Sequence, residues 1–142
     1  MPSRSRKHAK AYNTYRKTLP AGVCQFCEIK TGSPDLVKES DHFMVIKNIF
    51  PYSLWDTQAV ADHVMLVPKQ HSDSIGNLTA EAAVEFVHLL AEYEGNGYNV
   101  YARAPQSSIK TVMHQHTHLI KPTGKSRSFL FYLRKPYLRL YR

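Results

Sequence analysis

Three histidines at alternate positions, in the run His114-Gln115-His116-Thr117-His118-Leu119-Ile120, constrain this chain most strongly. Side chains alternate between the two faces of a β-strand, so the three imidazoles are predicted to share one face, about 6.6 Å apart along the strand. Buried imidazoles make poor core material, because each needs hydrogen-bond partners. The run therefore predicts a strand that presents histidines to a metal ion, to a phosphate group or to both. The alternative, an exposed polar strand, is disfavoured because histidine is uncommon and suited to acid–base, nucleophilic and metal-binding roles.

A second set of metal-binding side chains is the pair Cys24 and Cys27, which are the only cysteines in the chain. Cysteines spaced C-x-x-C in a chain without a secretory signal favour metal or redox chemistry over a structural disulfide. One tetrahedral zinc ion accepts four ligands, fewer than two cysteines and three histidines would offer. We therefore expect some of the three histidines to have another role.

The charge is divided between the body of the chain and its two ends. Residues 1–20 carry six basic side chains and residues 121–142 carry seven, with no acidic residue in either segment. The remaining six of the 19 basic residues lie with all 11 acidic residues in the middle, which gives that part a net charge of −5. Two basic extensions suit a long anionic partner such as a nucleic acid, or simply keep the chain soluble.

Hydrophobic periodicity and turn signals predict an α+β fold. Strands are expected at Leu36–Glu39, Phe43–Lys47, His63–Val67, Tyr98–Ala102 and Val112–Ile120, and a loop is expected over 50–61. One principal helix is expected after the N-cap Thr79, with an apolar stripe on Ala83, Phe86, Val87 and Leu90.

Three segments are expected along the chain. Residues 1–20 form a basic N-terminal arm, partly helical over 7–17, residues 21–122 form the folded domain, and residues 123–142 form a basic, aromatic C-terminal tail. No stretch approaches the ~20 apolar residues of a membrane-spanning helix. The N-terminus has no apolar core of a secretory signal, so we expect a cytoplasmic protein without membrane partners.

Three motifs together resemble the histidine-triad (HIT) family. His114–Ile120 resembles the triad motif, and Asp62–His71 resembles the strand that leads into a Pro-Lys-x-His turn. Cys24–Ile29 resembles the C-x-F-C element of the zinc-containing branch, and Phe43–Pro51 is similar to a wall of the family's nucleotide pocket. The resemblance covers about residues 22–122, and the order and spacing of the motifs make it more specific than the triad alone. It implies a HIT-like fold, an antiparallel sheet of about five strands with one principal helix.

The resemblance also implies a role for individual residues. His116 matches the nucleophile, His118 matches the third histidine, which faces the phosphate, and His63 matches a histidine beside the triad. Asn48 falls where the family places a polar residue on the ribose hydroxyls, with Met44 and Ile46 near the base. The family's structural zinc would be held by Cys24, Cys27, His71 and His114, which form a closed tetrahedral site.

The segment before the first histidine departs from the family pattern. The family usually has Gly-Gln-Ser/Thr there, whereas this chain has Ile109-Lys110-Thr111. Thr111 matches the hydroxyl that contacts the phosphate or leaving group, with Ser107 and Ser108 as alternatives. Lys110, and Arg103 at a position commonly held by a neutral amide, add positive charge near the phosphate, or are exposed loop residues.

Two aromatic residues of the 50–61 loop have two possible placements. Tyr52 and Trp55 could stack over a nucleotide base or pack beneath the loop. Their size favours packing, because large aromatic side chains are mostly buried.

The function implied by the resemblance is that of a nucleotide hydrolase with a covalent nucleotidyl-histidine intermediate. The substrate would be a nucleoside polyphosphate, a phosphoramidate or an adenylylated molecule, and the sequence leaves its leaving group open. Histidine at 118, where the transferase branches typically have glutamine, favours hydrolysis. The alternatives are a nucleic-acid-directed HIT enzyme and a zinc-stabilised nucleic-acid-binding module that uses the basic extensions. Family members are commonly homodimers, so we expect one here.

Overall fold

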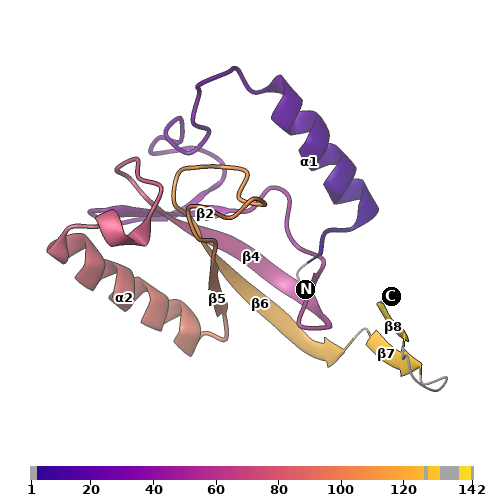
Figure 1. Cartoon of the computed structure of the whole chain (residues 1–142). Helices are drawn as coiled ribbons and strands as arrows, with labels where there is room; N and C mark the ends of the chain where they lie inside the picture. Colours follow the sequence, from indigo (N-terminus) through magenta and orange to yellow (C-terminus); the bar gives the residue numbers. More distant parts are fainter. Residues whose placement is uncertain (1–2, 127, 132–137, 142) are drawn as a thin grey trace.

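The computed structural model of this chain, which describes residues 3–126, 128–131 and 138–141, is an α+β fold built on one antiparallel sheet (Figure 1). Helix α1 (Arg6–Thr18) precedes the sheet, whose strands run in the order β1-β2-β4-β6-β5, with β3 paired to β4. These strands are β1 (Leu36–Glu39), β2 (Phe43–Lys47), β3 (Leu54–Trp55), β4 (Gln58–Pro68), β5 (Asn99–Ala102) and β6 (Thr117–Ser126). A 3₁₀ turn at Ile75–Asn77 leads into helix α2 (Ala80–Gly95), and β7 (Ser128–Phe131) pairs with β8 (Leu138–Tyr141) in a separate sheet.

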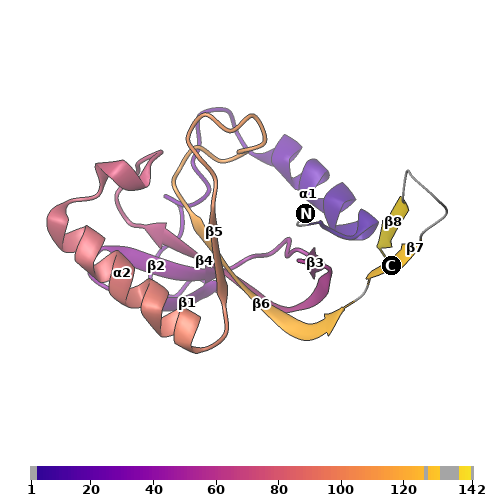
Figure 2. The same ribbon diagram turned by 60° about the horizontal axis from the view of Figure 1, so that its bottom comes forward.

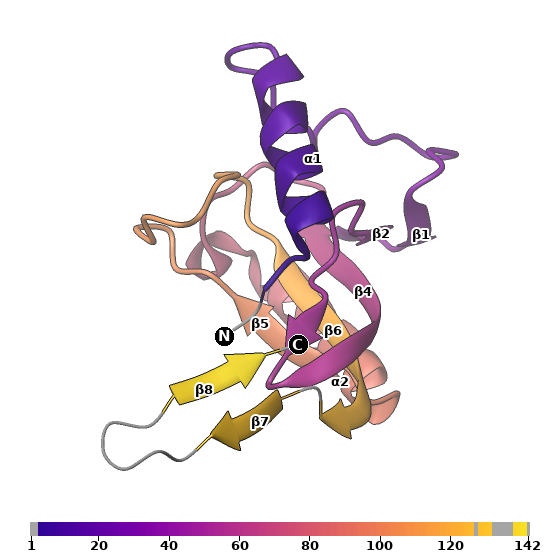
Figure 3. The same cartoon turned by 90° about the vertical axis from the view of Figure 1, so that its right-hand side faces the viewer.

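The two faces of the sheet carry different layers. Alternate residues of β2 and β4, such as Val45 and Leu66, pack under helix α2, whose first turn begins at the N-cap Thr79. The residues between them, such as Ile46 and Met65, pack against Phe26 of the N-terminal loop on the opposite face. Helices α1 and α2 accordingly lie on opposite sides of the sheet (Figures 2 and 3). The predicted α+β architecture and its principal helix are confirmed.

The strand predicted over Val112–Ile120 begins only at Thr117, so the prediction for 112–116 is wrong. Thr117 pairs with Leu66 on one side and with Ala102 on the other. Before it the pairing stops on both sides, because β5 ends at Ala102 and the last two residues of β4, Val67 and Pro68, pair only with β2. The Gln115 N–H instead donates to the Ser72 carbonyl at 2.5 Å. His114 and His116 therefore lie on a loop, and only His118 lies on a strand.

The segment 50–61, expected to be a loop, contains a hairpin. Strand β3 pairs with the start of β4, and the two residues between them, Asp56 and Thr57, have φ values of 46° and 67°. Two consecutive left-handed residues are typical of a type I′ hairpin turn. Tyr52 and Trp55 pack as expected: Tyr52 is buried, and the Trp55 ring lies 5.2 Å from that of Tyr101.

The two ends of the chain include regular structure. The segment expected to be partly helical over 7–17 forms α1, and β6 continues beyond residue 122 to Ser126. The limits of the three expected segments stay predictions. Among the described residues, no helix combines the length and apolarity needed to cross a bilayer. The expected cytoplasmic location also stays a prediction.

Candidate active site and metal centre

Four side chains from three distant segments form a candidate metal centre. Cys24 and Cys27 come from the loop after α1, His71 follows β4, and His114 precedes β6. Their ligand atoms all lie within 4.8 Å of one another. Cys27 Sγ is 3.2 Å from His71 Nδ1 and 3.5 Å from His114 Nδ1. Ligands about 2.0–2.3 Å from a shared tetrahedral ion would stand about 3.5 Å apart, so these residues fit a metal.

The orientation of the His114 ring also suits a ligand. His114 Nε2 donates to the Pro68 carbonyl at 2.9 Å, which leaves the lone pair on Nδ1. That Nδ1 lies 3.4 Å from Cys24 Sγ. Metal-binding histidines usually donate their second ring N–H to a carbonyl or carboxylate, which holds the ring in place. The Pro68 carbonyl at the end of β4 thus orients the His114 ring so that its Nδ1 faces the two thiols.

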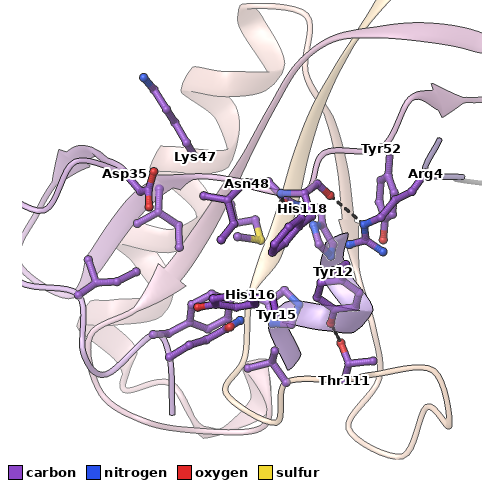
Figure 4. A pocket seen from close by; sticks show the side chains of 18 of the residues that line it. Arg4, Tyr12, Tyr15, Asp35, Lys47, Asn48, Tyr52, Thr111, His116 and His118 are labelled. Carbon is purple, nitrogen blue, oxygen red and sulfur yellow. Dashed lines mark hydrogen bonds between the residues drawn. The ribbon is translucent and has the colours of Figure 1, made fainter. Parts of the chain in front are cut away.

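A cleft of about 170 Å³ lies on the face of the sheet opposite α2. Its lining includes side chains from β2, β4 and β6, from the loops before them, and from α1 (Figure 4). His116 and His118 both line it. In Figure 4, Asp35 and Lys47 lie on one side of these histidines, and Arg4, Tyr12 and Thr111 lie on the other.

His116 is held in the tautomer that a nucleophile needs. Its Nδ1 donates to the His114 carbonyl at 2.8 Å, so the lone pair of the neutral ring is on Nε2. The ring packs against Phe26, with 5.2 Å between ring centroids, and is only 9% exposed. Burial lowers the pKa of His116, with smaller contributions from Lys110 and His114, so the neutral form persists below the ordinary range.

His63 and His118 form a hydrogen-bonded pair with defined tautomers. The Tyr52 backbone N–H donates to His63 Nδ1 at 3.1 Å, so the neutral His63 ring carries its proton on Nε2. His63 Nε2 then donates to His118 Nδ1 at 3.0 Å, which leaves the proton of His118 on Nε2. His118 is thus fixed as a hydrogen-bond donor at its outer nitrogen.

Burial keeps both members of this pair neutral. Burial, followed by the nearby Arg4 guanidinium, lowers the pKa of His63 to about 4. Burial, His116 and His63 lower the pKa of His118 well below its usual value. The Tyr52 ring also stacks on His63, with 4.9 Å between centroids, and excludes solvent from that side. The site therefore combines a lone pair on His116 with an N–H on His118 in adjoining rings 5.0 Å apart.

The remaining predicted binding residues fall into two groups. Asn48, Ile46, Arg103 and Thr111 line the cleft. Asn48 Nδ2 lies 3.2 Å from His63 Nε2, while its Oδ1 accepts the Phe50 N–H at 3.0 Å.

Met44 and Lys110 lie outside the cleft lining. Met44 packs with Phe26 and Val67 in the core on this face of the sheet. The buried Lys110 Nζ donates to the Asp73 carbonyl at 2.7 Å and to Gln115 Oε1 at 3.2 Å, so its charge holds two loops together. Ser107 and Ser108 are also absent from the cleft lining.

The N-terminal arm contributes cleft residues that the sequence reading did not assign to the site. Arg4, Tyr12 and Tyr15 all line the cleft. Tyr12 and Tyr15 are three positions apart, a spacing that puts both on one helix face. That helical spacing was the available signal, but nothing in the sequence says which part of the molecule the face meets.

No family model matches this chain, but individual proteins and solved structures are similar to it. The chain is 28% identical over 110 residues to adenosine 5′-monophosphoramidase HNT1 of Candida albicans, with 68% of each chain covered. It is 26% identical over 116 residues to Protein hit of Bacillus subtilis, with 75% of each covered. The crystal structure of a HIT family protein from Bacillus anthracis aligns with a TM-score of 0.56 and 25% identity, covering 75% of this chain and 77% of that one.

Proposed function

We propose that this chain is a histidine-triad nucleotide hydrolase in which His116 attacks the phosphorus of a nucleoside phosphate derivative. The observation that carries this proposal is the pairing of tautomers in the cleft. His116 Nδ1 donates to the His114 carbonyl, so Nε2 keeps its lone pair. The hydrogen bonds from the Tyr52 N–H to His63 and from His63 to His118 leave His118 with an outer N–H. A nucleophile beside a donor is the combination that phosphoryl transfer requires.

The reaction proceeds in two displacements. The Nε2 lone pair of His116 forms a bond to phosphorus as the bond to the leaving group breaks, and the leaving group keeps that electron pair and is protonated by water. In the second step a water oxygen bonds to phosphorus and gives a proton to the hydroxide left by the first step, while the P–Nε2 bond breaks and its electron pair returns to His116. The net reaction consumes one water molecule and yields a nucleoside monophosphate. His118 Nε2–H donates to a phosphate oxygen and stabilises the charge that develops there.

The substrate half that stays on His116 is a nucleotide. Ile46 and Phe26 form an apolar wall of the cleft suited to a base, and Asn48 lies at the position expected to meet the ribose. Arg103 and Thr111 line the same cleft and suit the phosphate oxygens. The similarity to a protein named as an adenosine 5′-monophosphoramidase favours an adenosine phosphoramidate as the first substrate to test.

Zinc is the metal we propose for the Cys24, Cys27, His71 and His114 centre. Two thiolates and two imidazoles form a donor set typical of structural zinc, and four protein ligands leave no open position for a substrate. Bound zinc would supply folding energy. By joining the loop after α1 to the His114 loop, it would also hold His116 in place from outside the cleft.

The direct test is turnover of adenosine 5′-phosphoramidate together with trapping of the intermediate. With a substrate labelled at the α-phosphorus, a rapid quench should show acid-labile label on His116 before product accumulates. Labelling of a different residue, or turnover without a covalent intermediate, would contradict the mechanism.

We also propose that the protein is a homodimer, as the family resemblance implies. Strand β5 stands at one edge of the sheet, and its Val100 is 44% exposed. An edge strand with an exposed apolar residue is suited to pairing with a second copy. Sedimentation equilibrium should give twice the chain mass, and a Val100→Lys change should shift the protein toward the monomer. A monomer at micromolar concentration would disprove this assignment.

A further inference from the structure

We propose that helix α1 and the residues around it form a second subsite of the cleft, which binds a nucleotide as the leaving group. The subsite is made by Arg4, Tyr12, Tyr15 and Phe50, with Arg103 from the loop after β5. The proposal rests on the proposed function and adds the chemical class of the group that leaves the phosphorus when His116 attacks. A nucleotide combines a flat aromatic base with anionic phosphate, and the subsite offers aromatic rings and guanidinium groups.

The aromatic part of the subsite is a cluster of three rings at the cleft wall. The Tyr12 and Tyr15 rings lie 5.4 Å and 5.3 Å from the Phe50 ring, and all three residues are half-buried. Every nucleobase has a face that can stack on such rings. Ile46 and Phe26 also line the cleft. The cleft therefore offers aromatic rings for a base in addition to the apolar wall of Ile46 and Phe26.

Arg4 connects the ring cluster to the histidines. Its guanidinium lies 4.6 Å from the centre of the Tyr12 ring and 4.9 Å from the centre of the Tyr52 ring. The Tyr52 ring in turn lies 5.5 Å from the His118 ring. A leaving group bonded to a phosphorus at His116 and His118 would thus meet Arg4 before it reached Tyr12. Figure 4 shows Arg4 and Tyr12 on the side of the histidines opposite Asp35 and Lys47.

Hydrogen bonds to the loop after β2 and to the loop before β6 hold the subsite in a fixed position. Arg4 Nε donates to the Phe50 carbonyl at 2.8 Å, and the Ser5 N–H donates to Ser53 Oγ at 2.9 Å. The Tyr12 hydroxyl is hydrogen-bonded to the Thr111 hydroxyl. These contacts join residues 46, 48 and 99 positions apart, so α1 is positioned by the cleft itself.

The charge of this end of the cleft favours an anion. None of the ion pairs found among the described residues includes Arg4 or Arg103. The carboxylate in the cleft lining, Asp35, lies on the far side of the histidines in Figure 4. Beyond the cleft, the exposed side of α1 carries further cations: Arg6, Lys7, Lys10, Arg16 and Lys17. A leaving group with phosphates suits both the cleft and its surroundings.

Equilibrium binding to the full-length protein tests the subsite without turnover. The probes are adenosine monophosphate and a diadenosine triphosphate analogue whose phosphates are joined by methylene bridges, so that it cannot be hydrolysed. Calorimetry should show the dinucleotide binding about 10-fold more tightly than the mononucleotide. The ratio of the two dissociation constants should fall about 10-fold in Tyr15→Ala and in Tyr12→Ala.

Two matched variants separate stacking from helix structure. Tyr12→Phe keeps the ring and removes only the hydroxyl, so it should keep the preference for the dinucleotide. Asn13→Ala, on the exposed side of α1, should keep it as well. Equal affinity for both probes in the wild type, or an unchanged ratio in Tyr15→Ala, overturns the subsite. Loss of the preference in Asn13→Ala overturns it too, because any disturbance of α1 would then suffice.

The same chemistry could come from a free dinucleotide or from a nucleic-acid end, and a third probe distinguishes them. A short single-stranded DNA carrying a 5′-adenylyl group would also reach the exposed cations of α1. If about five of these meet phosphates, its affinity should fall with salt with a log–log slope of roughly −3 to −5. A slope that matches the dinucleotide analogue assigns the subsite to free dinucleotides.

Failure of the subsite and failure of the proposed function give different results. Turnover of adenosine 5′-phosphoramidate without a dinucleotide preference overturns the subsite alone. A dinucleotide preference that is lost in Tyr15→Ala, in a protein without turnover, overturns the proposed function and supports the subsite as a binding site.

Discussion

The metal centre and the cleft place neighbouring histidines in opposite roles. His114 and His116 are two positions apart on one loop, and both are buried. His114 donates from Nε2 to the Pro68 carbonyl and presents Nδ1 to the thiols, whereas His116 donates from Nδ1 to the His114 carbonyl and keeps the lone pair on Nε2. The role of each imidazole is thus decided by the partner of its other nitrogen.

The same comparison separates stability from chemistry. The metal centre joins three segments that are distant in the sequence, so we expect its loss to reduce the free energy of unfolding. The cleft histidines are held by hydrogen bonds to backbone and to each other, so we expect their loss to reduce rate more than stability.

The largest expected effect is that of His116→Ala on turnover. Removing the nucleophile should lower kcat by about 10⁴-fold or more, as single losses from a catalytic unit often do. Metal content and the urea midpoint should stay close to wild type, and His116→Asn, which keeps a polar side chain, should behave in the same way. Metal loss in both variants would show that the two groups form one unit.

Cys24→Ser should have the opposite pattern. We expect it to release the metal and to lower the free energy of unfolding by about 5 kcal/mol, because structural zinc contributes its binding energy to folding. Plasma mass spectrometry and urea unfolding measure the two effects. Val23→Ser, an exposed neighbour, is the control and should change neither. Full stability without metal would remove the structural role of the centre.

His118→Ala should lower kcat by about 10²–10³-fold, less than the loss of the nucleophile. The reason is that His118 donates to the phosphate and forms no bond to phosphorus. His118→Gln keeps an N–H near the same place and should recover part of the rate. An effect on kcat as large as that of His116→Ala would assign His118 a covalent or proton-transfer role.

The pH dependence of stability should reveal the cleft pair. In the folded protein the pKa of His63 is about 4. Between pH 6.5 and pH 4, His63 therefore takes up its proton mainly in the unfolded state. Its contribution is present above pH 6.5 and is lost as the pH falls to 4, by about 3 kcal/mol.

Urea unfolding across this pH range should show a shallower loss in His63→Leu than in wild type. His88→Ala, which removes an exposed histidine on α2, is the control. Metal content measured at each pH separates this effect from protonation of the metal ligands. Identical slopes in His63→Leu and wild type would contradict the assignment.

Features that depend on local patterns could be predicted from the sequence. Strands β1 and β2 have the predicted limits, because their apolar runs are bounded by turn residues. The C-x-x-C pair and the two histidines that the resemblance grouped with it do come together in space. Such motifs were readable because residue type and spacing along the chain carry their chemistry.

Features that depend on residues far apart in the sequence could not be predicted from the sequence. The start of β6 at Thr117 depends on where its pairing with β4 and β5 stops, and the alternation of residues 114–118 carries no information about that. Lys110, a candidate phosphate ligand by position, donates instead to a carbonyl 37 positions away. The apolar and aromatic residues of α1 were visible, but not the cleft they line.

By itself, the sequence determined the α+β class, the principal helix, and the groups of cysteines and histidines, because residue chemistry and short-range spacing are properties of the chain. Only the tertiary structure decided which nitrogen of each histidine is free and that the basic arm forms a wall of the cleft. Those outcomes depend on hydrogen bonds such as Tyr12 to Thr111, which join residues 99 positions apart. Such bonds form only after the sheet has brought the segments together.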